Sequence, residues 1–249
     1  MAEKLDVLAI AAHPDDTGLT CSGTLAKLSR QGKKVGVLDL TQGEMGTRGT
    51  PEQRLIEAQN AAEILGLTVR KNLGLPDCGL QNTEYHHRVI MEMVRHYRPD
   101  ICLINAPDDR HPDHRDASLL VSDVLFYSGL QKIQTYDSFE TPQEPWRPAH
   151  ILHYLQHWNL EPTIVFDISD TIEIREKAIM AFESQFNNPA GDGEPETYVS
   201  TPEFFEALRG KARHYGQLIG VEFGEPFIYR GGPMPVSGFD GLLEMEVKK

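Results

Sequence analysis

Cysteine is scarce in this chain, and positive charge is outweighed by negative charge. The three cysteines, Cys21, Cys78 and Cys102, form an odd number and contain no C-x-x-C pair. They predict neither a disulfide framework nor a thiolate zinc site, so we expect a reducing cytoplasm as the compartment. Lysine and arginine number 24 against 37 aspartate and glutamate residues, a formal net charge of −13. We find no basic cluster that would bind phosphates, so we expect no nucleic-acid partner.

The sequence also has no long apolar run near its beginning, and its first residues do not predict a signal peptide. The first residues, Met-Ala-Glu-Lys-Leu-Asp, lack the basic and apolar segments of a signal peptide. The longest early apolar run, residues 7–12, is too short to cross a bilayer, and the acidic charge disfavours an anionic membrane surface. We therefore expect no membrane partner. The 249 residues show no repeat or domain boundary, so we expect one domain over residues 1–249.

Short apolar runs alternate with amphipathic stretches in the first half of the chain. The runs predict strands over 7–12, 35–40, 69–73 and 101–105, and the stretches predict helices over 19–31, 51–65, 85–97 and 117–127. Thr50-Pro51-Glu52-Gln53 is typical of a helix start, with an N-cap, a proline at N1 and a glutamine at N3. This alternation predicts an α/β fold whose parallel sheet is covered by helices on both faces.

The pattern is weaker beyond residue 130. Strands are expected over 151–155 and 164–168, and a helix is expected from Ser169 or Asp170 to Phe186. Residues 187–202, rich in glycine, proline, asparagine and glutamate, predict a mobile loop. A last helix over 202–218 is followed by what we expect to be an irregular C-terminal part.

Two segments rich in histidine and aspartate follow predicted strands. His13-Pro14-Asp15-Asp16 ends the first strand, and residues 108–114, Asp-Asp-Arg-His-Pro-Asp-His, follow the fourth. Either segment alone would be an ordinary polar turn. Ligands of open α/β sheets, however, bind at the carboxyl ends of the strands, where both segments are expected to lie. Together they predict one shared site.

Metal chemistry explains this combination of residues. Zinc accepts histidine nitrogen and carboxylate oxygen, and catalytic zinc sites use three protein ligands plus a water. A histidine and a carboxylate from the first segment and a histidine from the second would supply the three ligands. A remaining aspartate would then be free to accept a proton from water. The same donors accept Fe²⁺, Mn²⁺ or Co²⁺, so Zn²⁺ is the expectation by default.

The two segments resemble the signature pair of the LmbE-like (PIG-L) metal-dependent deacetylases. The resemblance extends over nearly the whole chain, through Asp39-Leu40-Thr41, Gly43-Glu44, Arg54, Leu75-Pro76-Asp77, Asp167-Ile168-Ser169-Asp170 and Gly220-Val221-Glu222. It implies a Rossmann-like, mostly parallel sheet and a hydrolase that removes acetate from an N-acetylglucosaminyl conjugate. Within the family the chain looks most like the deacetylases of bacillithiol biosynthesis, which act on N-acetyl-α-D-glucosaminyl L-malate.

Roles for individual residues follow from the same resemblance. It implies that His13, Asp16 and His114 bind the metal and that Asp15 is the general base. His111 would stabilise the oxyanion or protonate the leaving amine, and Asp113 would orient or charge His111. The family usually has a glutamate where this chain has Gly18, so any contact made by that glutamate must be absent or supplied elsewhere.

Three further residues are expected to contact the substrate. Arg54 and Arg110 would pair with carboxylates of a malate group, because guanidinium groups bind carboxylates in a bidentate manner. Glu44 would line the pocket.

Other interpretations stay open at the level of the sequence. The aglycone is unresolved between malate, inositol and a chito-oligosaccharide, and the oligomeric state is not readable, although the resemblance is compatible with a homo-oligomer. A dinucleotide-binding protein is disfavoured because the first turn lacks G-x-G-x-x-G and carries carboxylates that would repel a pyrophosphate. A non-catalytic sugar-binding protein with a structural metal is disfavoured because structural zinc sites use four protein ligands.

Overall fold

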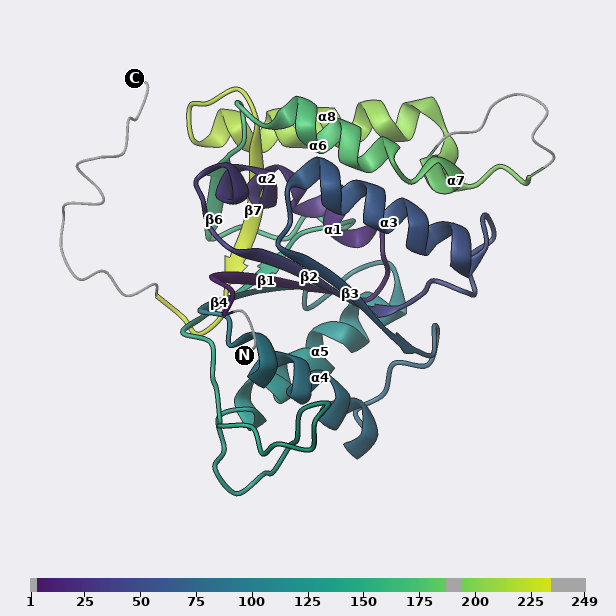
Figure 1. Cartoon of the computed structure of the whole chain (residues 1–249). Helices are drawn as coiled ribbons and strands as arrows, with labels where there is room; N and C mark the ends of the chain where they lie inside the picture. The colour runs from purple at the N-terminus through teal and green to yellow at the C-terminus, as the bar shows by residue number, and fades with distance from the viewer. Residues whose placement is uncertain (1–3, 187–193, 234–249) are drawn as a thin grey trace.

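A seven-stranded sheet forms the centre of the molecule (Figure 1). The computed structural model describes residues 4–186 and 194–233. The strand order is β3-β2-β1-β4-β5-β7-β6, and the strands span β1 Val7–Ala11, β2 Val35–Thr41, β3 Val69–Leu75, β4 Ile101–Ile104, β5 His150–Tyr154, β6 Ile164–Asp167 and β7 Gly224–Tyr229. Strands β1 to β5 pair in parallel, and β7 runs antiparallel to both β5 and β6.

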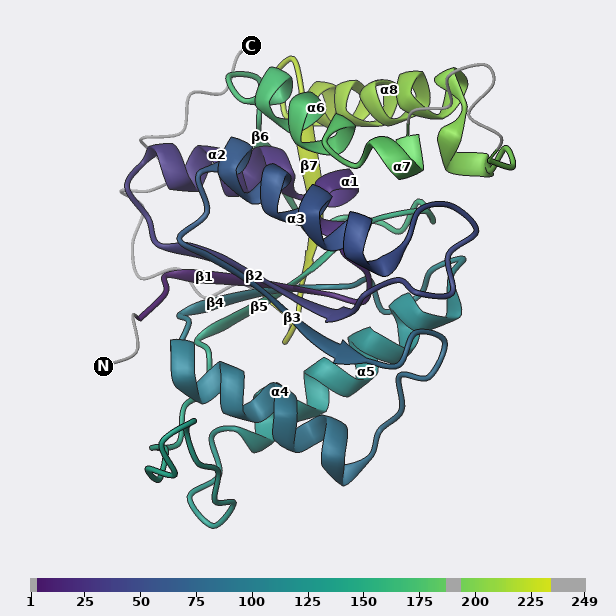
Figure 2. The ribbon, with the colours of Figure 1, turned by 45° about the vertical axis from the view of Figure 1, so that its right-hand side comes forward.

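Helices cover both faces of this sheet (Figures 1 and 2). Helices α4 Glu84–Tyr97 and α5 Pro112–Tyr127 lie on one face, and α1 Asp16–Thr20, α2 Ser22–Arg30 and α3 Pro51–Leu65 lie on the other. Helices α6 Ile172–Met180, α7 Glu183–Phe186 and α8 Pro202–Leu218 form an outer layer on the second face, and the short 3₁₀ helix η1 Tyr198–Ser200 precedes α8. None of the helices in the described part of the chain is long and apolar enough to span a bilayer.

Each face of the sheet has its own apolar core. On the α4/α5 side, Leu8 and Ile10 pack with Ile90 and Val121, while Val7 and Ala9 face the other way and pack with Leu25. A strand whose alternate side chains enter two different cores must be apolar throughout, which explains the unbroken apolar run in β1. A third cluster joins α1–α3 to α6 and α7: Leu19, Ala26, Ala58, Ala61, Leu65, Ala178, Ile179, Phe182 and Phe186.

The expected α/β class with a mostly parallel, doubly covered sheet is confirmed. Two helix boundaries in the first half differ from the prediction. The single helix expected over 19–31 is two helices, separated at Cys21, whose backbone has φ −135° and ψ 9°. Helix α5 begins at Pro112 rather than near residue 117, because Pro112 is the first helical residue and the His111 ring caps the N–H of Asp113.

The expectation of an irregular C-terminal part is wrong for residues 224–229. These residues form β7, which lies between β5 and β6. Glycine and proline are unfavourable in strands, so Gly224 and Pro226 hide this strand at the level of the sequence. The expected helix up to residue 186 is divided into α6, with Thr171 at its N-cap, and α7. The mobile loop predicted over 187–202 lies outside the described residues up to 193, and its later part contains η1.

A buried carboxylate on β7 ties the end of the chain to its beginning. Glu225 accepts hydrogen bonds from the backbone N–H groups of Gly23 and Thr24, at 2.9 and 2.7 Å, in the first turn of α2. The Nε of Arg175, on α6, lies 3.1 Å from the same carboxylate. A helix N-terminus favours a negative charge, and the buried guanidinium needs an anion. Glu225 therefore holds α2, α6 and β7 together.

We expect Glu225→Ala to lower the free energy of unfolding by about 3–5 kcal/mol, because it leaves a buried guanidinium unpaired. Urea denaturation at pH 7 measures this loss. Glu222→Ala is the matched control, since Glu222 forms an exposed ion pair with Arg213, and it should change stability by less than about 0.5 kcal/mol. Equal losses for the two variants would contradict the role of Glu225.

Candidate metal and catalytic site

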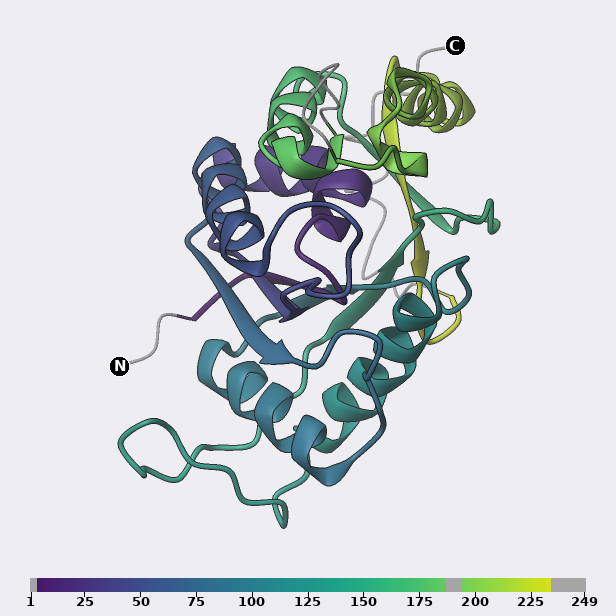
Figure 3. The ribbon, with the colours of Figure 1, turned by 90° about the vertical axis from the view of Figure 1, so that its right-hand side faces the viewer.

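The carboxyl ends of the parallel strands meet at one edge of the sheet, between the two helical layers (Figure 3). Pairing places Val7 of β1 opposite both Val35 of β2 and Ile101 of β4, so the three strands end at similar heights. Beyond that edge, the Asn105 side chain accepts a hydrogen bond from the N–H of Ala12 at 3.1 Å. This contact holds the loop after β1 against the loop after β4, so the two histidine-rich segments lie side by side.

The three expected metal ligands converge in this place. His13 Nδ1 lies 3.3 Å from His114 Nε2, and His114 Nε2 lies 3.1 Å from Asp16 Oδ1. His13 Nδ1 is 3.7 Å from Asp16 Oδ2. Ligand atoms that each lie about 2 Å from a shared zinc ion are roughly 3–3.5 Å apart in a tetrahedral site. The donor types and their spacing therefore fit a divalent metal ion.

A second ring of carboxylates surrounds the two histidines. His114 Nδ1 lies 2.9 Å from Asp109 Oδ1, and His13 Nε2 lies 3.0 Å from Asp77 Oδ1 and 3.4 Å from Asp113 Oδ2. Carboxylates on the far nitrogen of a ligating histidine orient the ring and select its tautomer. Each imidazole thus presents one nitrogen to its neighbours in the ligand cluster and the other to a carboxylate.

Sequence reasoning had assigned no role to Asp77 or Asp109. Asp77 follows β3, so it lies at the same edge of the sheet as the two histidine-rich segments. Its position after a parallel strand was the sequence signal that could have identified it. Asn105 and Gln156 were also missed, and they donate to the Asp16 carboxylate at 3.2 and 2.9 Å. Gln156 follows β5, and the N–H of Met45, which follows β2, donates to the Asp77 carboxylate at 2.9 Å. Each parallel strand therefore sends a polar group to the ligands themselves or to their carboxylate partners.

The expectation that Asp113 orients His111 is not what the structure shows. The Asp113 carboxylate lies against His13 and accepts the Cys78 N–H at 2.8 Å, whereas the Asp113 backbone N–H donates to His111 Nδ1 at 3.3 Å. Because α5 begins at Pro112, the Asp113 side chain turns toward β3 rather than toward the ring before it. His111 lies close to the other two rings, and its nitrogen could join theirs around an ion.

The electrostatics of the cluster favour the charged forms of its histidines and of Asp16. Burial lowers the pKa of His13, but hydrogen bonds to Asp113, Asp16 and Asp77 outweigh it and raise that pKa well above its usual value. Burial also lowers the pKa of His114, but the negative charge of Asp16 and the hydrogen bond to Asp109 outweigh burial and raise that pKa to about 9. Burial raises the pKa of Asp16, but His114 and His13 outweigh burial, so the pKa of this carboxyl lies well below its usual value.

His111 has the opposite electrostatic environment. Burial and the neighbouring His13 and His114 lower its pKa. A neutral His111 that accepts the Asp113 N–H at Nδ1 must carry its proton on Nε2. The ring can therefore donate a hydrogen bond into the pocket that it lines.

Asp15 and Arg54 form an ion pair beside the ligands. Arg54 Nη2 donates to Asp15 Oδ1 at 3.0 Å, and Arg54 Nη1 donates to the carbonyl of Gly43 at 2.8 Å. Both side chains line the pocket that also contains the metal ligands. We expected Arg54 to be available for a substrate carboxylate, but its two terminal nitrogens are already paired within the protein.

Glu44 supports the loop after β3. Its carboxylate accepts the Asp77 N–H at 2.8 Å and the Gln42 N–H at 3.2 Å, and Glu44 is absent from the described residues that line the pockets beside the ligands. A direct contact of Glu44 with the substrate stays a prediction. Its contact with Asp77 links it to the site only through the backbone.

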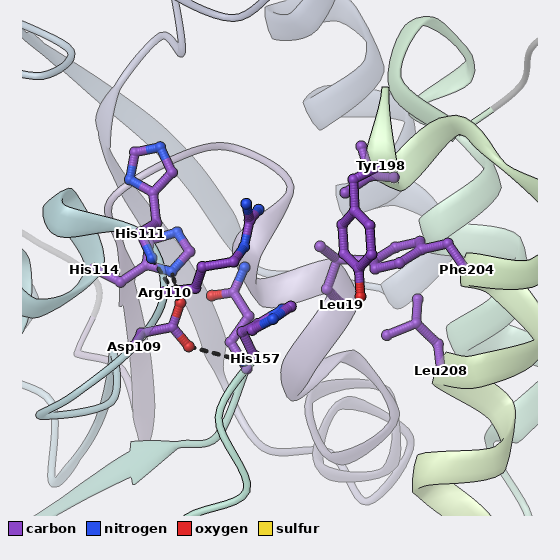
Figure 4. Close-up of a pocket in the computed structure, with 11 residues that line it drawn as sticks. Leu19, Asp109, Arg110, His111, His114, His157, Tyr198, Phe204 and Leu208 are labelled. Carbon is purple, nitrogen blue, oxygen red and sulfur yellow. Dashed lines mark hydrogen bonds and ion pairs between the residues drawn. The ribbon is translucent and has the colours of Figure 1, made fainter. Parts of the chain in front are cut away.

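Arg110 lies at the mouth of a pocket next to the ligands (Figure 4). Its guanidinium stands 5.3 Å from the ring centre of Tyr198, and the part of the chain that the structure describes offers it no carboxylate partner. In Figure 4, His111, His114 and Asp109 lie on one side of this pocket, and Tyr198, Phe204 and Leu208 lie on the other. The pocket thus has a polar wall from the loop after β4 and the first turn of α5, and an apolar wall from η1 and α8.

Gly18 does not face the ligands. A β-carbon at this position would lie 3.9 Å from Phe182 and 4.0 Å from Ile179, in ordinary contact with the apolar cluster under α6 and α7. A glutamate side chain would start toward these apolar residues, so glycine fits this packing. The ligand set itself does not depend on position 18.

Asp39 has a structural partner that argues against dinucleotide binding. Its carboxylate is buried and receives two hydrogen bonds from Arg70, at 2.8 and 2.9 Å. Arg70 also donates to the carbonyl of Pro14. An aspartate at the end of β2 that bound a ribose would have to be accessible. Asp39 instead holds Arg70, which in turn contacts the loop that carries His13 and Asp16.

We expect metal binding at pH 7 to release about two protons per ion, because His13 and His114 have raised pKa values and must be neutral to bind a metal. Calorimetric titration with Zn²⁺ in buffers of different ionisation enthalpy measures this release. The affinity should rise with pH up to about 9, the pKa of His114. His13→Ala and His114→Ala should lose binding, and exposed His214→Ala should keep it. Binding without proton release would contradict the assignment.

Comparison with known proteins places this arrangement among deacetylases. Residues 8–125 match the PIG-L family model, described as GlcNAc-PI de-N-acetylase. The chain is 32% identical over 229 residues to a diacetylchitobiose deacetylase from Thermococcus kodakarensis, covering 88% of this chain and 80% of the relative. The conserved protein TT1542 from Thermus thermophilus has a TM-score of 0.82 and 36% identity, covering 94% of this chain and 98% of that one. The N,N'-diacetylchitobiose deacetylase from Pyrococcus horikoshii has a TM-score of 0.74 and 27% identity, covering 97% and 89%.

Proposed function

This chain belongs to the PIG-L deacetylase family, and we propose that it removes acetate from an N-acetylglucosaminyl conjugate with the help of one divalent metal ion. The observation that carries the proposal is the convergence of His13, Asp16 and His114, with Asp15 next to them and outside the ligand set. Two of the similar proteins named above are deacetylases of an acetylated amino sugar, which supports the substrate class.

His13, Asp16 and His114 would hold the metal, and we propose Zn²⁺. A metal in this position supplies Lewis-acid polarisation of the acetamide carbonyl and a lowered pKa for water. The family relationship supports a metal ion, and the choice of zinc rests on the histidine and carboxylate donors alone.

The protein's own groups supply the proton transfers. The Asp15 carboxylate accepts the proton of the attacking water, since it lines the pocket and is not among the proposed ligands. His111 donates a hydrogen bond from Nε2 to the developing oxyanion. The neutral ring can do this because its Nδ1 accepts the Asp113 N–H and its proton is therefore on Nε2. As the C–N bond breaks, protonated Asp15 passes the proton that it took from the water to the sugar nitrogen, which releases acetate and a free amine.

As the specific substrate within this class, we propose N-acetyl-α-D-glucosaminyl L-malate. Arg110 supports a carboxylate-bearing aglycone, because it is an exposed cation beside the ligands with no carboxylate partner among the described residues. The alternatives are a chito-oligosaccharide, as in the names of two similar proteins, and an inositol conjugate. Both alternatives are neutral, so they differ from the malate conjugate in charge.

We expect Asp15→Ala to retain a full equivalent of metal and to lower kcat roughly 10²–10⁴-fold, because general-base assistance is lost. Free-amine release from an N-acetylglucosaminyl conjugate, together with metal analysis of the same preparation, measures both quantities. Asp116→Ala, which changes a partly exposed aspartate on α5, serves as the control and should leave kcat unchanged. A near-native kcat for Asp15→Ala would refute the base assignment.

Arg110→Ala tests the aglycone. We expect KM for the malate conjugate to rise about tenfold or more, because a charge-assisted hydrogen bond contributes about 1.5–3 kcal/mol. KM for the neutral methyl N-acetylglucosaminide should not change. The neighbouring exposed arginine on α5 gives the control variant Arg115→Ala. Equal effects of Arg110→Ala on the two substrates would argue against a carboxylate at this position.

A further inference from the structure

We infer that Arg54 is a positioning residue for Asp15 rather than a substrate-binding residue; this inference rests on the proposed function. The Arg54 side chain reaches Asp15 from α3, and the residue is only 4% exposed. Among the described residues, Arg54 makes the only hydrogen bond to the Asp15 carboxylate, through Oδ1. The second oxygen, Oδ2, is therefore left to face a reacting water.

Asp15 lacks the restraints that hold the neighbouring Asp16. The Asp16 carboxylate receives hydrogen bonds from the His13 N–H, Asn105 and Gln156. Asp15 stands at the N-cap of α1, yet its side chain makes no capping hydrogen bond within the described residues. Without Arg54, nothing in the described residues would hold the Asp15 carboxylate in one rotamer. A general base needs such a fixed orientation to meet the proton that it removes.

Arg54 is itself held at both ends. Its backbone N–H donates to the Thr50 carbonyl at 2.9 Å, in the first turn of α3, and the Thr50 hydroxyl caps the same turn. At the other end, Nη1 donates to the Gly43 carbonyl. Gly43 has φ +68°, and a β-carbon there would lie 1.9 Å from Nη1. The loop after β2 thus closes tightly over the guanidinium, which leaves no room for a substrate carboxylate on Nη1.

A comparison with Arg110 separates the two functions of arginine at this site. Arg110 is exposed and has no carboxylate partner in the described part of the chain, as a residue awaiting an anionic ligand should be. Arg54 is buried, and both of its terminal nitrogens are paired. A substrate carboxylate that replaced Asp15 on Nη2 would remove the hydrogen bond that holds the base. The geometry therefore favours Arg54 as the residue that holds the Asp15 carboxylate in position.

A double-mutant cycle over Arg54 and Asp15 tests this inference in the metal-loaded enzyme. Arg54→Ala should lower kcat roughly 10²-fold, the cost typical of a misplaced catalytic group. KM should stay within about threefold for both the malate conjugate and the neutral methyl N-acetylglucosaminide, since binding groups are untouched. In the Asp15→Asn background, Arg54→Ala should cause no further loss of kcat, because both changes disable the same step.

Two further variants keep the test sharp. Arg54→Lys preserves the charge but not both hydrogen bonds, so its kcat should lie between those of the wild type and Arg54→Ala, with KM unchanged; it replaces Arg54→Ala in the cycle if that variant does not fold. Arg48→Ala removes a different buried arginine, in the loop between β2 and α3, which contacts the carbonyls of Ser184 and Pro195. It should lower stability in urea without the 10²-fold loss of kcat expected for a misplaced catalytic group.

The outcomes distinguish this inference from the proposed function. If Asp15→Asn turns over normally, the assignment of Asp15 as the base fails and the proposed mechanism with it. If Asp15→Asn is inactive but Arg54→Ala raises KM for the malate conjugate alone, or its loss in kcat adds to that of Asp15→Asn, only the positioning role of Arg54 is overturned. Non-additive losses in kcat with unchanged KM support it.

Discussion

The pairing of Asp16 with His114 and His13 is the interaction on which the rest of the site depends. These three groups are buried at the edge of the sheet, where a single unpaired charge would be costly. Mutual attraction makes the cluster tolerable, and the outer carboxylates of Asp77 and Asp109 extend it. Such a cluster has an excess of negative groups around two imidazoles, which is the composition that a divalent cation neutralises best.

The sheet supplies this cluster without long connections. Because β1 and β4 are adjacent and parallel, the loops that follow them emerge at the same edge, although His13 and His114 are separated by 101 residues. The loops after β2 and β3 close the other side through Gly43 and Asp77. The apolar wall comes from a different layer, η1 and α8, so this pocket combines side chains from the edge of the sheet with side chains from the outer helical layer.

The parts of the molecule that follow simple periodicity were predictable from sequence. The buried strands β1, β2 and β4 are continuous apolar runs, and α3 carries its start signal in Thr50 and Pro51. Side-chain pairing was not predictable. Nothing in the sequence indicates that the Asp113 carboxylate turns to His13 rather than to His111, because this depends on where α5 begins. Arg54 was recognised as part of the site, but its partner, Asp15, depends on how closely the loop around Gly43 packs. Strand β7 was missed because tertiary pairing overrides the poor strand propensity of Gly224 and Pro226.

The position of β7 has a consequence for how the chain acquires its structure during synthesis. Strand β5 pairs with β4 on one side. In the described part of the chain its other edge pairs with residues 227–229, which are made more than 70 residues later. Until then a nascent chain exposes an unpaired strand edge, which is a template for association with other chains. The short length of β5, five residues, limits that hazard during the interval.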